Sequence, residues 1–180
     1  MFRVIEMQLL DITAKISSIA ANAAIVVTLG VGWSTYLDQI ENKKIEASLD
    51  LVRDFNNETH LSSRRALYEF WAQYDLSKMP ENTVTYSFLS ELLVKWGQER
   101  PKQSPSLDME ILVITDFFER VENCIQEEVC NKKIVLSQLG GYGHQFYCIY
   151  SHELKRIGGR LRRPDFASNL AVFAKRLGAC

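Results

Sequence analysis

Three side chains that can bind a metal ion recur at four-residue spacing in the segment GHQFYCIYSHELKR. They are His144, Cys148 and His152. On a helix this spacing places all three along one face, and imidazole and thiolate are both zinc ligands. The two histidines would lie about 12 Å apart along the axis, so the three side chains cannot share one ion. A site would need a ligand from another helix, such as Cys124 or an acidic residue. We therefore favour a structural role, with a buried cysteine between two partly exposed histidines, and predict no metal or cofactor. If a metal is bound after all, Cys148 and His152 are the candidate ligands.

A second pattern pairs an arginine with a histidine. In the segment RDFNNETH, six residues separate Arg53 from His60, and Asp54 directly follows the arginine. The pattern resembles the signature of helical HEPN ribonucleases, in which such a pair activates and stabilises the scissile phosphate region of RNA at a dimer interface. The resemblance implies a metal-independent ribonuclease using Arg53 and His60 as the enzymatic alternative. A solvated arginine and a loop histidine explain the same spacing. The chain contains no P-loop, GxGxxG, HExxH or GxSxG motif, so a non-catalytic role is favoured.

The densest run of charge is the basic segment KRIGGRLRRP. Its cations are Lys155, Arg156, Arg160, Arg162 and Arg163. Such a run can bind anionic lipid headgroups, at about 1 kcal/mol for each charge near the surface. It can also bind the phosphates of a nucleotide or nucleic acid, or balance acidic residues of the same chain. We expect internal balance or a lipid surface ahead of nucleic acid.

The charge of the chain is nearly neutral overall but unevenly distributed. The formal net charge is −1 over 180 residues, with 47% hydrophobic and 24% charged residues, which is ordinary for a globular protein. Residues 38–154 hold 12 Lys/Arg against 19 Asp/Glu, whereas residues 155–180 hold 7 Lys/Arg and one aspartate. This asymmetry indicates a charge-dependent contact of the C-terminal segment, inside the molecule or with a partner.

The four cysteines do not form a recognisable framework. They are Cys124, Cys130, Cys148 and Cys180, and none belongs to a CxxC pair. Their spacing suggests no disulfides and requires no oxidising compartment. We therefore expect unpaired cysteines in a cytoplasmic domain.

Residues 16–37 form the longest uncharged stretch and read ISSIAANAAIVVTLGVGWSTYL. As a helix they would extend roughly 33 Å, compared with about 30 Å of hydrocarbon in a bilayer. Trp33 and Tyr36 lie near one end, where such rings favour the headgroup layer. A signal peptide fits less well, because residues 1–15 are not simply basic and the apolar stretch continues past ANA. A buried helix is the remaining alternative. We predict a short tail over residues 1–15 and a transmembrane helix over 16–37.

Small side chains share one face of this predicted span. They are Ala20, Ala24, Thr28 and Gly32, with the polar Asn22 near the middle. Small residues allow close helix approach in lipid, and an amide is better placed against a helix than against lipid tails. We expect a homo-oligomer contact there, although small residues also occur in spans that do not associate. The two ends of the span carry similar numbers of basic residues, so charge alone gives only a slight bias in orientation. The cysteines of the C-terminal domain are expected to be unpaired, and we therefore expect this domain on the cytoplasmic side.

The rest of the chain has helical periodicity and predicts an all-α domain over residues 38–180. The span is expected to continue as a helix to about residue 55, where NNETH interrupts it. Apolar spacing then predicts helices before Pro80, over 83–98 and over 111–129, the last closed by Asn131 and two lysines. Glycines are expected to split the following segment into a short and a longer helix, before a final helix at FASNLAVFAKRL. The expected fold is one transmembrane helix followed by a bundle of about five to six helices.

The order of these features resembles the bacterial DUF4760 family of small helical proteins, which often carry an N-terminal membrane helix. The resemblance covers roughly residues 45–160 and rests on the segments DFNN, RRALYEFW, DFFERVENCI, CNKKIVLSQL and ELKRI. It implies an anchored all-α fold and transfers no active site. The expected function is a single-pass protein of the inner membrane, of interaction or signalling type, that binds a protein or small effector through its cytosolic domain.

Overall fold

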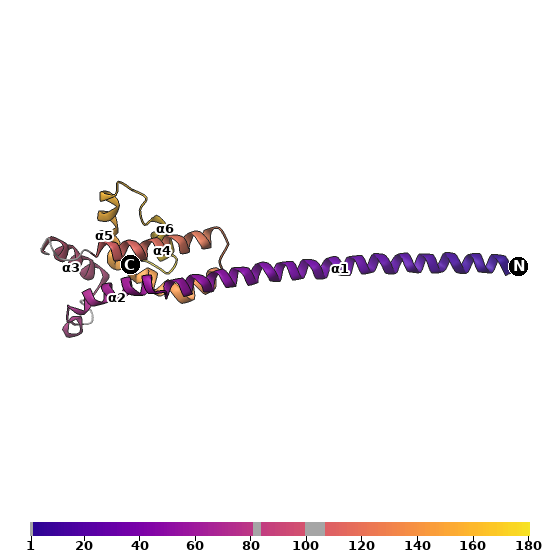
Figure 1. The fold of residues 1–180 in the computed structure, drawn as a ribbon, viewed down its shortest axis with the longest axis horizontal. Helices are drawn as coiled ribbons and strands as arrows, with labels where there is room; N and C mark the ends of the chain where they lie inside the picture. The colour runs from indigo at the N-terminus through magenta and orange to yellow at the C-terminus, as the bar shows by residue number, and fades with distance from the viewer. Residues whose placement is uncertain (1, 81–83, 100–106) are drawn as a thin grey trace. The chain divides into compact units, whose positions relative to one another are not determined.

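The computed structural model describes the backbone of residues 2–80, 84–99 and 107–180, and side chains from Thr28 onward except those of residues 77, 98 and 99. Within these ranges every regular element is a helix, so the predicted all-α class is confirmed (Figure 1). The elements are α1 (Phe2–Phe55), α2 (Glu58–Ala72), the 3₁₀ helix η1 (Leu76–Lys78), α3 (Tyr86–Glu99), α4 (Asp108–Gln126), α5 (Lys132–Arg160) and α6 (Ser168–Lys175). The chain divides into two units, residues 1–42 and 43–180.

The first unit consists of the N-terminal part of α1. Among the residues with described side chains, no helix offers an apolar stretch long enough to cross a membrane. Most of the predicted span lies outside those residues, as do the expected oligomer contacts Ala20, Asn22 and Ala24. Thr28 and Gly32 are described and exposed. The transmembrane helix therefore stays a prediction.

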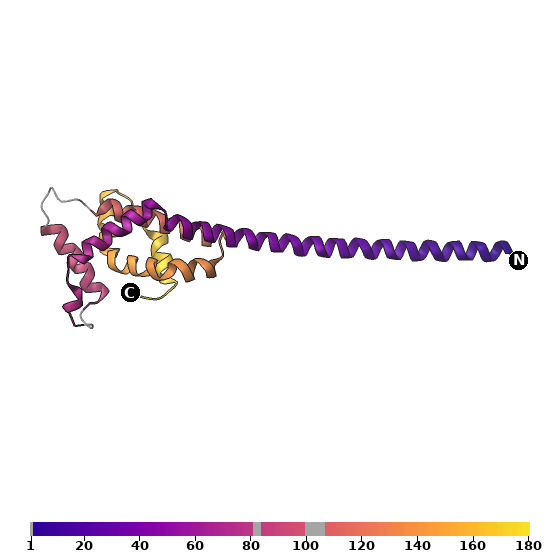
Figure 2. The same ribbon diagram turned by 60° about the horizontal axis from the view of Figure 1, so that its bottom comes forward.

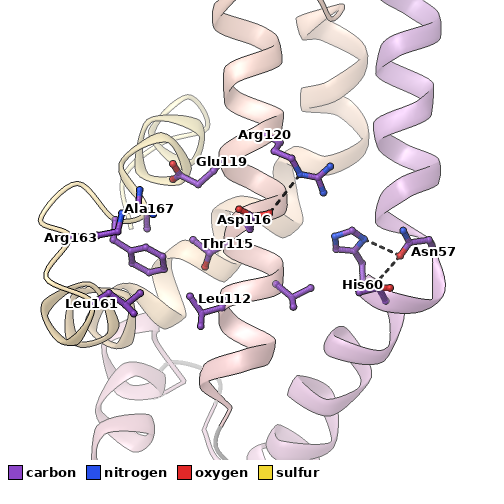
Figure 3. A pocket seen from close by; sticks show the side chains of 13 residues that line it. Asn57, His60, Leu112, Thr115, Asp116, Glu119, Arg120, Leu161, Arg163 and Ala167 are labelled. Carbon is purple, nitrogen blue, oxygen red and sulfur yellow. Dashed lines mark hydrogen bonds and ion pairs between the residues drawn. The ribbon is translucent and has the colours of Figure 1, made fainter.

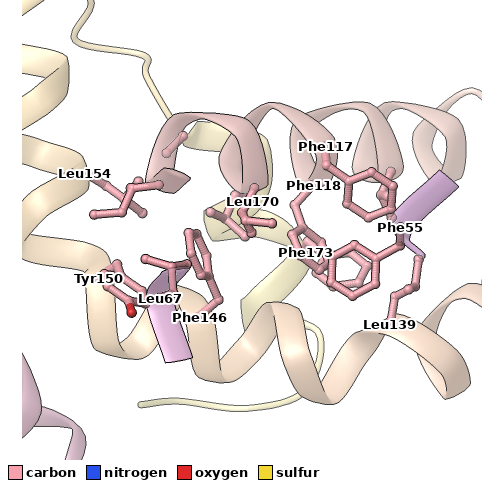
Figure 4. Packing of buried hydrophobic residues seen from close by; sticks show 14 of the residues in the cluster. Phe55, Leu67, Phe117, Phe118, Leu139, Phe146, Tyr150, Leu154, Leu170 and Phe173 are labelled. Atoms are coloured by element: carbon pink, nitrogen blue, oxygen red, sulfur yellow. The ribbon is translucent and has the colours of Figure 1, made fainter. Parts of the chain in front are cut away.

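The second unit is a helical bundle in which α5 is central. α5 packs against α3, α4 and α6, and α4 also packs against α2 and α6 (Figures 1 and 2). Aromatic rings from α1, α2, α4, α5 and α6 contribute to the core, where Phe117, Phe118 and Phe173 are fully buried (Figure 4). Phe55, in the last turn of α1, stacks on Phe117 with 4.9 Å between ring centroids. Such pairs add about 0.5–1.5 kcal/mol beyond the burial of their area, so the end of α1 belongs to this core.

A partly buried hydrogen bond joins α2 to α5. Trp71 Nε1 donates to the Tyr150 hydroxyl oxygen over 2.7 Å. Burial raises the pKa of Tyr150 well above its ordinary value. Burial likewise raises the pKa of Tyr142, about two turns earlier on α5, to about 12. Both phenols therefore stay protonated at neutral pH.

The expected helix end at Asn131 is wrong, because this residue begins the next helix. Its side chain accepts the backbone N–H of Ile134 and caps α5. Its own N–H donates to the buried Ser48 Oγ over 2.8 Å, and that hydroxyl donates to the carbonyl oxygen of Lys44. Asparagine occurs both after the end of a helix and at the N-cap that begins one. Its presence at position 131 therefore did not show which of the two helices it belongs to.

The predicted glycine break is also wrong, because α5 runs without interruption through both pairs of glycines. A Cβ atom built on Gly143 would lie 2.6 Å from ring carbons of Phe118 and Phe173. At Gly141, by contrast, a Cβ would meet nothing within 4 Å. Gly143 therefore lets α4 and α6 approach α5 closely, and this packing outweighs the low helix propensity of glycine.

The expectation of unpaired cysteines is wrong as well. All four are paired, as Cys124–Cys130 and Cys148–Cys180, with 5.4 Å between the Cα atoms of each pair. The first pair closes the turn between α4 and α5, and the second joins residues 32 positions apart, a pairing that spacing alone does not reveal. The prediction of a cytoplasmic domain rested on unpaired cysteines, and that argument no longer holds.

Candidate functional site

A cavity of about 610 Å³ lies between the start of α2, the middle of α4 and the segment that connects α5 to α6 (Figure 3). We call it the His60 cavity. Its polar lining comprises Asn57, Thr59, His60, Thr115, Asp116, Glu119, Arg120 and Arg163. Apolar walls are contributed by residues such as Leu112 and Phe166. Sites for small molecules have this size and this combination of apolar walls with a few convergent polar groups.

His60 is the most deeply placed titratable group of the cavity, with 6% of its surface exposed. Its Nδ1 lies 2.8 Å from the carbonyl oxygen of Asp54 and 3.0 Å from Asn57 Oδ1. Both partners are acceptors, so Nδ1 carries the proton and Nε2 of the neutral ring is an acceptor. Figure 3 shows this second ring nitrogen turned toward the side of α4 that carries Asp116 and Arg120.

The local sequence explains this placement. Asn57 is the N-cap of α2, and its side chain accepts the backbone N–H of His60 over 3.1 Å. The cap therefore holds His60 in the first turn of α2, with its ring against Phe117 at 4.9 Å between centroids. A capped helix start and a buried aromatic neighbour fix the ring in one orientation.

The charged groups around His60 are already partnered. Arg120 Nη2 lies 3.0 Å from Asp54 Oδ2, and Arg120 Nε lies 3.9 Å from Asp116 Oδ2. Glu119 Oε1 accepts the N–H of Leu170 at the start of α6 over 2.9 Å. The cavity therefore presents a hydrogen-bond acceptor at depth and a balanced set of charges nearer its mouth. That arrangement suits a small polar molecule better than a highly charged one.

The structure does not join the two residues of the ribonuclease pattern. Arg53 Nη1 pairs with Asp50 over 2.6 Å, and 74% of the Arg53 side chain is exposed. No contact in the described part of the chain links Arg53 to His60, whereas Arg120 lies in the same cavity as His60. Sequence reasoning missed Arg120, because it lies 60 positions away on another helix and carries no local signal. The ribonuclease alternative stays a prediction.

The basic run is largely paired within the chain. Arg156 contacts Glu153 over 2.6 Å and Asp108 over 2.5 Å, and Arg160 contacts Asp108 over 2.8 Å. Partial burial lowers the pKa of Arg156, but its hydrogen bonds to the two carboxylates outweigh burial and raise it overall. Arg163 lies 3.8 Å from Asp165. These contacts favour internal charge balance.

Two cations of the run remain for an external anion. Lys155 and Arg162 are exposed and make no ion pair with a described residue. Binding of an anionic lipid or nucleotide by the run Lys155, Arg156, Arg160, Arg162 and Arg163 stays a prediction.

The candidate metal ligands do not assemble into a site. Cys148 is bonded to Cys180, so it offers no thiolate. His144 Nε2 lies 3.7 Å from Cys148 Sγ, and its Nδ1 lies 3.1 Å from the carbonyl oxygen of Ala174. Among the residues that the structure describes, no three metal-ligating side chains gather around one point.

Comparisons with known proteins add no family to this geometry. No protein-family model, curated protein or solved structure matches the chain. The resemblance to the DUF4760 family therefore stays a prediction.

Proposed function

We propose that the protein is a single-pass, membrane-anchored helical protein of interaction or signalling type. Its unit of residues 43–180 binds a small polar effector in the His60 cavity. The observation that carries this proposal is the orientation of His60, whose Nδ1 is satisfied by the chain while Nε2 turns into a cavity of about 610 Å³. A buried acceptor with one fixed tautomer selects a ligand that donates a hydrogen bond.

The surroundings of His60 narrow the class of effector. A molecule with an N–H or O–H group for Nε2 and a carbonyl or weakly anionic group toward Arg120 would satisfy both ends of the cavity. The hydrogen-bond partner of Nδ1 is the carbonyl of Asp54 in the last turn of α1. An effector that repositions the ring is therefore coupled to that turn, which gives the site a route to signalling.

Thermal unfolding of the full-length chain in detergent tests the effector site. The probes are amino acids, nucleosides, nucleotides and sugars, each added at 1 mM. We expect one class to raise Tm, because a ligand at about 100 times its Kd stabilises the folded state by roughly 2.7 kcal/mol. Val113→Trp should abolish the shift, since Val113 lines the cavity.

Val172→Trp is the matched control for this experiment. Val172 lies on α6 with 41% of its surface exposed, outside the cavity lining, so its substitution should preserve the shift. A shift that survives Val113→Trp, or a panel without any stabilising member, contradicts the effector site.

The proposed anchor is residues 16–37, placed in the inner (cytoplasmic) membrane. Its support in the described part of α1 is a group of exposed large apolar side chains. They are Leu29, Val31, Trp33, Tyr36 and Leu37, each at least 48% exposed. Lipid would remove these surfaces from water, at roughly 25 cal/mol for each Å². Close packing of Ala20, Asn22, Ala24, Thr28 and Gly32 would let two spans associate.

Extraction of membranes at alkaline pH tests the anchor. The wild-type chain should stay in the membrane pellet. The double variant Ile25→Lys with Leu29→Lys should move to the soluble fraction, because each lysine near the centre of a span costs about 2.5–3.5 kcal/mol. Gln39→Lys, beyond the span, is the control and should stay in the pellet. A wild-type chain that fractionates as soluble without detergent contradicts the anchor.

A further inference from the structure

The two disulfides lie in different surroundings. Cys124–Cys130 closes a tight turn, where the carbonyl oxygen of Cys124 accepts the N–H groups of Val129 and Cys130 over 3.0 and 3.2 Å, with Cys130 buried and Cys124 half-buried. Cys148, by contrast, is buried on α5, while its partner Cys180 is exposed in the segment after α6. Both cysteines of the second pair line a separate open cavity of about 610 Å³ between α3 and α5. A solvent-borne thiol can therefore reach Cys180.

A histidine lies beside the buried sulfur of the second pair. His144 Nδ1 is 3.1 Å from the carbonyl oxygen of Ala174, which only accepts, so Nδ1 carries a proton. His144 Nε2 is 3.7 Å from Cys148 Sγ. If Nε2 gains a proton, the ring donates to the carbonyl through one nitrogen and to the sulfur through the other. An imidazolium in contact with a cysteine stabilises its thiolate.

We propose that Cys148–Cys180 is a reversible redox pair that exchanges with small thiols of the glutathione class, whereas Cys124–Cys130 is structural. His144 is its positioning residue, because it stabilises the thiolate that leaves when the pair is opened. This inference does not rest on the effector site or on the membrane anchor. It assigns a second chemistry to the domain, at a place that the His60 cavity does not include.

The exchange proceeds in two balanced steps. The thiolate of a first small thiol attacks the exposed Cys180 Sγ, the bond between the two cysteine sulfurs breaks, and Cys148 leaves as a thiolate that His144 stabilises and can protonate. The thiolate of a second small thiol then attacks the sulfur of the first small thiol in its mixed disulfide with Cys180. It forms the disulfide of the small thiol and releases Cys180 as a thiol. Two electrons have passed from two small thiols to the cysteine pair.

Reduction would change how the segment after α6 is held. Arg176 is bonded to the buried Glu122, and Leu177 packs over Gly140. Beyond these two contacts, residues 178–180 are exposed and the disulfide is their covalent tie to α5. Opening the pair frees Cys180, which lines the cavity between α3 and α5. The redox state of one bond thereby changes one wall of that cavity.

Thiol trapping in graded glutathione buffers tests the proposal. The full-length chain in detergent is equilibrated at fixed ratios of reduced to oxidised glutathione, alkylated, and digested, and each cysteine pair is quantified by mass spectrometry. We expect half-reduction of Cys148–Cys180 at a value of [GSH]²/[GSSG] at least about tenfold lower than that for Cys124–Cys130. Equal values for the two pairs would overturn the assignment.

The role of His144 is tested by His144→Asn, which retains an amide N–H to donate to the carbonyl of Ala174 but removes Nε2. We expect about tenfold slower exchange, and a thiolate absorbance at 240 nm that develops at higher pH than in the wild-type reduced chain. His152→Asn is the control on the same helix and should match the wild type. A His144→Asn chain with wild-type exchange rate and thiolate absorbance would overturn the role of the histidine.

Discussion

Replacing Arg176 with methionine is expected to lower the free energy of unfolding by about 3–5 kcal/mol, because it leaves a buried carboxylate without its cation. Glu122 is fully buried on α4, with 0% of its surface exposed. Arg176 Nε donates to Glu122 Oε2 over 2.9 Å, and Arg176 Nη2 donates to Glu122 Oε1. The hydrogen bonds to Glu122 raise the pKa of Arg176, so its guanidinium stays charged. Urea denaturation of the full chain with both disulfides intact measures the loss.

Two further variants separate the buried pair from an ordinary surface charge. Arg163→Met removes an exposed arginine whose nearest carboxylate, on Asp165, is 3.8 Å away, and should cost less than about 1 kcal/mol. Glu122→Leu combined with Arg176→Met removes both charges and should recover most of the loss, since no buried charge is then left unpaired. An Arg176→Met variant that loses no more stability than Arg163→Met would contradict this account.

Helical periodicity was sufficient to predict the fold class and much of the core. The apolar stripe expected on residues 111–129 is buried in α4 at Ile111, Ile114, Phe118, Val121 and Ile125. The prediction is wrong for Val129, which is 55% exposed, because α4 ends at Gln126 and Val129 lies in the turn that follows. Spacing along a helix is a local property, so the sequence reports it directly.

Contacts between distant segments left no comparable signal. Arg120 joins His60 in one cavity, and Cys180 joins Cys148, only because α4, α5 and the segment after α6 pack in one bundle. Glutamate at position 122 belongs to the buried face of α4, yet its type suggests a solvated side chain until its partner on another helix is known. The candidate sites therefore became recognisable only from the tertiary structure.

The glycines of α5 show how packing overrides propensity. Glycine disfavours a helix interior by about 1 kcal/mol relative to alanine, so clustered glycines reasonably indicate a break. In the structure, close packing offsets this cost, because the buried Gly143 lets the rings of Phe118 and Phe173 lie against the α5 backbone. Whether a glycine interrupts a helix or serves a helix contact depends on which face it occupies.

Gly143→Leu is accordingly expected to destabilise the domain by about 3 kcal/mol or more, at the upper end of the range for overpacked cores. Even its Cβ would lie 2.6 Å from the rings of Phe118 and Phe173, and both rings are fully buried, so neither can move aside without disturbing the core. The gain in helix propensity of about 1 kcal/mol does not offset this clash. Denaturant unfolding followed by circular dichroism gives the difference from the wild type.

Gly141→Leu supplies the matched control two positions earlier on the same helix. Gly141 is exposed and a Cβ there meets nothing within 4 Å, so the substitution should leave stability unchanged or raise it by about 0.5–1 kcal/mol. The two variants share residue type, helix and chain length, and differ in the face that they occupy. If α5 were interrupted at its glycines instead of packed through Gly143, the two substitutions would have similar effects, and equal stabilities would refute the arrangement of α4, α5 and α6 described above.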